Sequence, residues 1–137
     1  MPKRPLKLSI RIPPYRGPRN AWRKQLHKAI LKQQQESPVS YRDSDRLEVE
    51  VRLYMEDTAL RFHDVDNRLK DIMDALQGRA GGTKKKPSLA PIIPNDKQIY
   101  RVIMEKAPIP WQSHAFGHLI IRRFRQWDFL RRLPTTR

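Results

Sequence analysis

Residues 47–55 read Leu-Glu-Val-Glu-Val-Arg-Leu-Tyr-Met, and this stretch decides the fold. Apolar side chains occupy every second position from Leu47 to Met55, and polar or charged side chains, with one tyrosine, stand between them. A period of two is typical of a strand with one buried face. We therefore predict a β-strand over residues 47–55, with the neighbouring elements packed against its apolar face.

The region before this strand predicts one more strand and one helix. Apolar residues at even positions from Leu6 to Ile12 alternate with polar residues, and this strand stops at Pro13-Pro14. From Asn20 to about Gln35 apolar residues recur at helical spacing, which indicates an amphipathic helix. Its polar face carries Arg23, Lys24, His27, Lys28 and Lys32.

The region after the strand predicts a second helix and two further strands. The helix has one apolar stripe ending at Leu76, and Gly78 is expected to terminate it. Strands are expected over 99–104 and 117–124, a basic loop at about 79–91 and a basic tail at about 125–137. These elements predict one domain over residues 1–137, with an α/β (α+β) fold. It consists of a small mixed sheet of about four strands and two main helices, in the order βαβαββ.

The charge of the chain favours a polyanionic partner. The 29 Lys and Arg outnumber 14 Asp and Glu, for a net charge of +15. A merely soluble basic protein, a binder of membrane headgroups and a binder of ribosomal RNA remain open on charge alone. The chain has no cysteine, which excludes disulfides, a thiolate nucleophile and a Cys-ligated zinc site. No stretch approaches the roughly 18 apolar residues of a membrane span, so we expect a cytoplasmic protein without a membrane partner.

Acidic residues are concentrated in the middle of this basic chain. Residues 1–35 hold ten Lys or Arg and no acid, whereas residues 43–74 hold ten acids and five basic residues. Clustered carboxylates give a nucleic-acid binder no advantage unless they have a task of their own. A metal site would be such a task.

Asp64 and Asp66 lie where a strand gives way to a helix, and two interpretations are open. Asp66 can be the N-cap of the helix, with Asp64 an exposed loop acid. Alternatively both carboxylates converge on Mg²⁺, which takes a few carboxylates together with water and phosphate oxygens. Lys70 follows Asp66 by one helical turn, and it either forms a salt bridge with Asp66 or contacts a phosphate.

Three more acids are candidates for the same cluster. Asp96 directly precedes the third strand, so it can approach the pair if that strand lies beside the second. Asp71 is expected to point elsewhere, and Asp74 is expected to form an ion pair.

The string DVDNRLKDIMDAL over residues 64–76, followed by NDKQI over 95–99, closely resembles the RusA family of Holliday junction resolvases. The family pattern is Asp-x-Asp-Asn-x-x-Lys, then Asp-Ala-Leu, then an acidic pair before x-Gln-Ile/Val. The resemblance covers about residues 6–106. The chain departs from the pattern at Asn95, which is neutral where the family has the first acid of the pair. The loop at 79–91 is also longer than expected.

The resemblance implies a homodimeric endonuclease that uses Mg²⁺ or Mn²⁺, and no small-molecule cofactor, to make paired nicks in four-way DNA junctions. Its catalytic residues would be Asp64, Asp66, Lys70 and Asp96, with the three acids as metal ligands. The basic residues expected at DNA, if they are more than solvated surface charges, are Arg16, Arg19, Arg23, Lys24, Lys28, Lys84, Lys85 and Lys86. The rival hypotheses are a structure-selective nuclease acting on other branched DNA and a non-catalytic basic nucleic-acid-binding protein.

Overall fold

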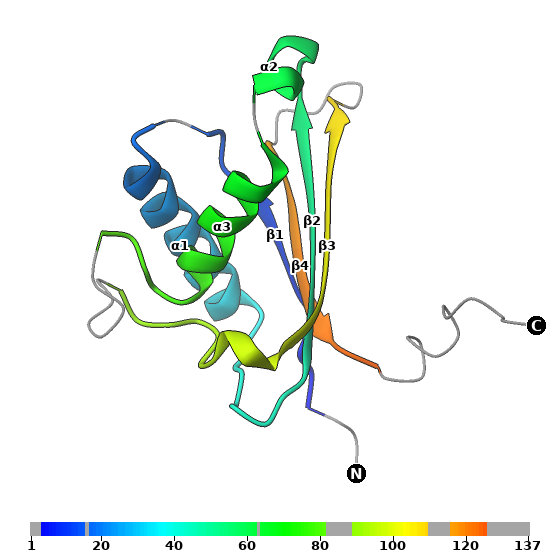
Figure 1. Cartoon of the computed structure of the whole chain (residues 1–137). Helices are drawn as coiled ribbons and strands as arrows, with labels where there is room; N and C mark the ends of the chain where they lie inside the picture. The colour runs from blue at the N-terminus through cyan, green and yellow to red at the C-terminus, as the bar shows by residue number, and fades with distance from the viewer. Residues whose placement is uncertain (1–3, 16, 63, 82–88, 110–115, 126–137) are drawn as a thin grey trace, which may run out of the picture.

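The part of the chain that the structure describes contains four strands and three α-helices, with a short 3₁₀ helix before the third strand. In chain order they are β1 (Leu8–Ile12), α1 (Arg19–Glu36), β2 (Leu47–Met55), α2 (Asp57–Phe62), α3 (Val65–Leu76), η1 (Asp96–Gln98), β3 (Ile99–Pro108) and β4 (Gly117–Arg123). The computed structural model describes residues 4–15, 17–62, 64–81, 89–109 and 116–125. The predicted α+β class with a mixed four-stranded sheet is confirmed (Figure 1).

The sheet has the strand order β1-β4-β2-β3. The central strand β2 pairs antiparallel with β4, where Val51 faces Leu119, and parallel with β3, where Val51 faces Met104. The strands β1 and β3 form the two edges. Because β2 and β3 are parallel, the segment that directly follows β2 and the segment that directly precedes β3 lie at opposite ends of the sheet.

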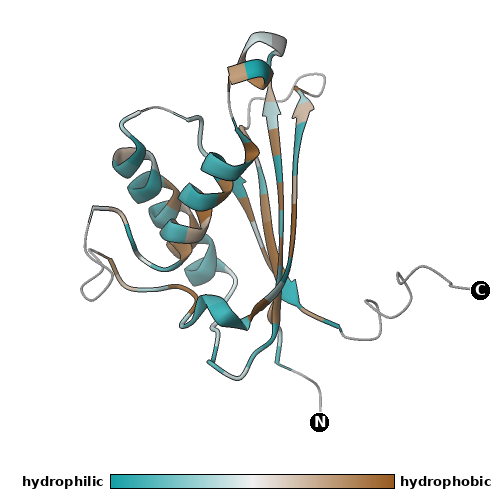
Figure 2. Cartoon of the chain, viewed as in Figure 1, coloured by the Kyte–Doolittle hydropathy of each residue, from teal (hydrophilic) through white to brown (hydrophobic). Residues whose placement is uncertain are grey.

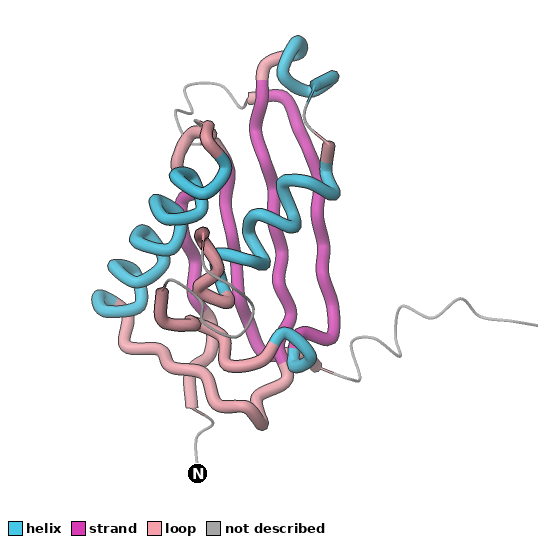
Figure 3. Tube along the Cα trace, turned by 60° about the vertical axis from the view of Figure 1, so that its left-hand side comes forward, coloured by secondary structure: helices cyan, strands magenta, loops and turns pink. Residues whose placement is uncertain are grey.

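One face of the sheet is covered by α1 and α3, which lie side by side across it (Figures 1 and 3). Figure 2 shows hydrophobic residues on these helices and on the strands that they cover. Trp22 and Leu26 of α1 and Ile72 of α3 are fully buried there with Val49 of β2. The alternation from Leu47 to Met55 therefore predicted the buried face of β2 correctly.

The largest differences from the prediction concern the first strand, the third strand and an additional helix. The first strand begins at Leu8 and not at Leu6, and the third extends to Pro108 because β2 pairs with it as far as Met55. The additional helix α2 forms between the second strand and the next helix, where no element was predicted. The basic tail lies almost wholly outside the described residues, as does the tip of the loop at 79–91. Within the described part of the chain, no helix combines the length and apolarity needed to cross a membrane.

Candidate functional site

Half of the ten acids over residues 43–74 serve as structural partners for arginines in the part of the chain that the structure describes. On the sheet face away from the helices, the buried carboxylate of Glu48 receives Arg101 at 2.7 Å and also pairs with Arg122. Asp45 receives two hydrogen bonds from Nη2 of Arg4, at 2.6 and 2.7 Å. Ion pairs with arginines therefore explain part of the concentration of acids over residues 43–74. A metal site must be sought among the acids that form no such pair.

Asp64 and Asp66 are two of those remaining acids, at the start of α3. Both are exposed, and neither forms an ion pair with a residue that the structure describes. Asp64, and not Asp66, occupies the N-cap position, with φ −76° and ψ 135°, and its side chain caps no helix N–H group. Instead its Oδ2 accepts a hydrogen bond of 3.3 Å from Nδ2 of Asn67. Helix capping therefore does not account for this pair of carboxylates.

Lys70 lies one turn along α3 from Asp66 and is exposed. Among the described residues it forms no salt bridge with Asp66, so that interpretation of the Asp66–Lys70 spacing is not observed. The helix N-terminus offers partial positive charge to the two carboxylates, which reduces the repulsion between them. The N-terminal part of α3 therefore presents two carboxylates and an ammonium group to solvent within about two helical turns.

The chain enters β3 at the end of the sheet opposite the start of α3 (Figure 1), and Asp96 directly precedes β3 in η1. It opens η1, which leads into β3, and Ile99 of β3 pairs with Leu47 at the beginning of β2. Asp64 and Asp66 instead follow the far end of β2, and the 12-residue helix α3, about 18 Å long, lies between the two positions. The expectation that a neighbouring strand brings Asp96 to the pair is wrong within one chain, because the two strands are parallel. The described residues contain no group of three His, Cys, Asp or Glu side chains that could hold a metal.

The residues around Asp96 have a structural role. Asn95 caps η1 by accepting a hydrogen bond of 3.0 Å from the backbone of Lys97. The buried amide of Gln98 donates to the carbonyl oxygens of Arg42, at 2.7 Å, and Asp45, at 2.8 Å. These bonds hold the loop before β2 against the turn before β3, and they explain the Asn and the Gln of this motif without catalysis.

The acid pair still fits a hard divalent cation. Mg²⁺ is commonly held by one or two carboxylates, and water and substrate phosphates complete its coordination. The carboxylate oxygens of Asp64 and Asp66 form no ion pair with a Lys, Arg or His side chain that the structure describes. Two exposed ligands make a partial site that needs the substrate, or further protein ligands, for completion.

The basic face of α1 is narrower than predicted. Lys24 and Lys28 are exposed, whereas the Arg23 side chain is only 13% exposed and pairs with Asp71 and Asp74. His27 is 3% exposed, and its Nε2 lies 2.7 Å from the carbonyl oxygen of Ala90. The reason is that α3 and the segment after residue 89 pack against this side of α1. Arg16, Lys84, Lys85 and Lys86 lie outside the described residues.

Asp71 is the residue whose importance the sequence did not reveal. It points away from Lys70, as expected, but into the contact between α1 and α3, where arginines of both helices surround it. The ion pair expected of Asp74 is confirmed, and its partner is Arg23 at 3.0 Å. The spacing of Arg19 and Arg23, four apart on one helix, was the available signal, but a sequence does not say which acid faces them.

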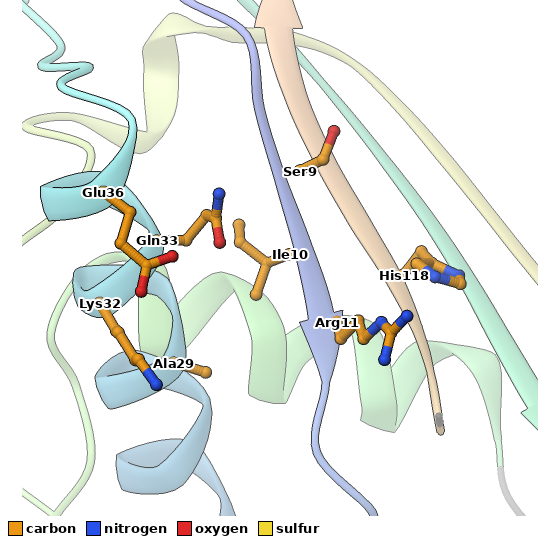
Figure 4. A pocket seen from close by; sticks show the side chains of 8 residues that line it. All are labelled: Ser9, Ile10, Arg11, Ala29, Lys32, Gln33, Glu36 and His118. Atoms are coloured by element: carbon orange, nitrogen blue, oxygen red, sulfur yellow. The ribbon is translucent and has the colours of Figure 1, made fainter. Parts of the chain in front are cut away.

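A hollow of about 470 Å³ lies elsewhere, between α1 and the edge strand β1 (Figure 4). Arg11 and His118 line it from the sheet, and Lys32 and Glu36 line it from the helix. It contains none of the predicted catalytic residues, so it is separate from the acid pair.

No family model matches the chain, and no curated protein matches it. The resemblance to the RusA family therefore rests on the motif residues alone.

Proposed function

We propose that the protein is a Mg²⁺-dependent endonuclease that resolves four-way DNA junctions by paired nicks. The observation that carries the proposal is the pair of exposed carboxylates, Asp64 and Asp66. Their side chains do not cap α3, and they form no ion pair with a basic side chain among the described residues. Lys70 lies one turn away, and the chain around them has a net charge of +15. In so basic a protein, a pair of acids without a basic partner is expected at a site where a metal ion binds next to a polyanion.

Each residue has a distinct role in this proposal. Asp64 and Asp66 hold the metal, which when bound supplies an activated water and offsets charge on the reacting phosphate. Lys70 contacts the scissile phosphate and stabilises the charge that develops on it. Lys24 and Lys28 add affinity for the DNA backbone that does not depend on sequence. The junction substrate and the homodimer rest on the resemblance, since a two-fold symmetric dimer matches the symmetry of a junction.

One observation favours a rival function, a non-catalytic nucleic-acid-binding protein. Asp96 lies far from Asp64 and Asp66 within one chain, so a single copy does not assemble the three expected ligands. Such a protein would bind DNA through its basic residues and leave the backbone intact.

The deciding experiment is a cleavage assay on a synthetic four-way junction in Mg²⁺, with a linear duplex and a flap as controls. We expect paired nicks from the wild type and a loss of at least about 100-fold in rate for Asp66→Asn, because a metal ligand is removed. The matched control is Glu36→Gln, which removes the same charge from an exposed acid that lines the hollow between α1 and β1 and should cut like the wild type. Binding of Mn²⁺, followed by water proton relaxation, should weaken in Asp66→Asn alone.

The outcomes separate the hypotheses. Absence of nicks in the wild type, or full activity of Asp66→Asn, would end the enzyme proposal. Faster cutting of the flap than of the junction would identify a structure-selective nuclease for other branched DNA. Tight binding without cutting would identify the non-catalytic binder.

A further inference from the structure

One buried carboxylate at the contact between α1 and α3 receives three arginines. Asp71 is fully buried. Its Oδ1 accepts hydrogen bonds from Nε of Arg19 at 2.9 Å and from Nε of Arg23 at 3.0 Å. Its Oδ2 lies 3.4 Å from Nη2 of Arg68, which is almost as deeply buried. We call Arg19, Arg23, Arg68 and Asp71 the arginine cluster.

The arginine cluster has more positive charge than Asp71 and its neighbour Asp74 neutralise. Asp71 and Asp74 face three guanidinium groups, so one positive charge is left over. The Nε and Nη1 atoms of Arg68 are buried without a hydrogen-bond partner among the described residues, and the guanidinium lies 3.9 Å from the ring centre of Tyr15. The positive charge that is left over favours a bound anion, because charge interactions are stronger where water is partly excluded.

The exposed member of the cluster lies beside the acid pair. The Arg19 side chain is 42% exposed, and its Nη2 lies 3.5 Å from the carbonyl oxygen of Asn67. Asn67 in turn donates to Asp64. Arg19 donates from Nε to Asp71 and from Nη2 to Asn67. The described residues supply no acceptor for its Nη1 atom. An arginine held along one edge of its guanidinium group can donate from the other edge to a phosphate.

We propose that Asp71 is a positioning residue that fixes Arg19 as a phosphodiester-binding group next to Asp64 and Asp66. The inference rests on the proposed function, because it takes a nucleic acid as the ligand. The alternative is that Asp71 only ties α1 to α3. The two accounts predict opposite changes in DNA affinity when the negative charge of Asp71 is removed.

The test measures binding of a fluorescent four-way junction in EDTA, over a series of salt concentrations. Asp71→Asn makes the protein more positive, so general electrostatics predicts tighter binding, as expected for the charge-matched control Glu36→Gln. Positioning predicts the opposite: binding about three- to tenfold weaker, with a salt slope smaller by about one phosphate contact. In an Arg19→Gln background, Asp71→Asn should have little further effect on affinity.

Arg19→Lys keeps the test decisive if Asp71→Asn fails to fold. Arg19 is half exposed, and lysine keeps its charge but cannot bind Asp71 along one edge and a phosphate from another. We expect binding weakened to a similar degree, with an unchanged thermal unfolding temperature. Wild-type affinity in Arg19→Lys, or in folded Asp71→Asn, would overturn the inference.

Cleavage assayed separately in Mg²⁺ distinguishes the two proposals. Weak binding by Asp71→Asn together with an inactive wild type overturns the nuclease and leaves the positioning role standing. Normal binding by Asp71→Asn with an active wild type overturns only the positioning role. A wild type that binds no nucleic acid overturns both.

Discussion

Asp45 shows how much the surroundings of a single carboxylate decide its role. It is buried, as Asp71 is, but the backbone N–H of Arg42 and the guanidinium of Arg4 both donate to it. Asp64, by contrast, is exposed and receives a single long hydrogen bond from Asn67. The buried acids hold segments of the chain together, and the exposed pair is free to bind a ligand.

The stability of the fold should depend on pH through Asp45. Burial acts to raise its pKa, but the hydrogen bond from the Arg42 backbone and the Arg4 guanidinium together bring the pKa below its ordinary value. Its stabilising contribution is therefore present above about pH 4 and is lost as the pH falls through the lower folded pKa. Thermal unfolding of the wild type and Asp45→Asn should differ at pH 7, with the wild type more stable. The difference should shrink below pH 4, and a constant difference down to pH 2 would contradict this assignment.

At the scale of elements, the two ends of α3 are built by different means. The C-terminal end is closed by backbone hydrogen bonds, from Gly78 to Ala75 at 3.0 Å and from Arg79 to Asp74 at 2.7 Å, in the Schellman arrangement. The N-terminal end has no side-chain cap, although two aspartates are present. The C-terminal end, whose backbone carbonyl groups are hydrogen-bonded, holds the helix in place. The N-terminal end, which has no side-chain cap, carries the candidate site.

Gly78→Ala should destabilise the protein strongly. Gly78 has φ +75°, and a Cβ atom there would lie 2.2 Å from the carbonyl oxygen of Leu89. The left-handed conformation alone costs an L-residue about 1–2 kcal/mol, and the backbone clash adds to that. The matched control is Gly17→Ala, where a Cβ would meet nothing within 4 Å. Chemical denaturation should show a lower midpoint for the Gly78 variant only, and equal midpoints would disprove the prediction.

At the scale of the whole molecule, the relative direction of two strands decides whether the expected ligands meet. The parallel pairing of β2 with β3 sends the chain before β3, with Asp96, to the end opposite Asp64 and Asp66. A two-fold axis perpendicular to the strands reverses their direction in a second copy. In the proposed homodimer, Asp96 of one copy can therefore approach the acid pair of the other.

Mixed dimers test this arrangement. Asp66→Asn and Asp96→Asn should each be inactive alone, but a mixture should regain activity, because one of the two sites in a mixed dimer keeps all three acids. That activity should nick one strand and not produce paired nicks. A mixture of Asp64→Asn with Asp66→Asn, whose defects fall in the same half of the site, should stay inactive. An inactive first mixture whose two variants co-purify through different affinity tags, and so form mixed dimers, would show that Asp96 does not act across copies.

The local elements could be predicted from the sequence, and the meeting of distant residues could not. The alternation over residues 47–55 predicted β2 with its observed boundaries, and Gly78 marked the end of α3. Local sequence patterns could not show that α2 forms or that β3 continues to Pro108, because both features depend on the segments that pack beside them.

The amino-acid sequence by itself determined the positions of the strands and main helices, the basic charge and the presence of the acid pair at a helix start. These follow from periodicity and from chemistry within a few residues. Only the tertiary structure decided that Asp96 lies apart from Asp64 and that three arginines converge on Asp71. The physical reason is that strand direction and helix packing are set by contacts between residues far apart in the chain, which no local pattern records.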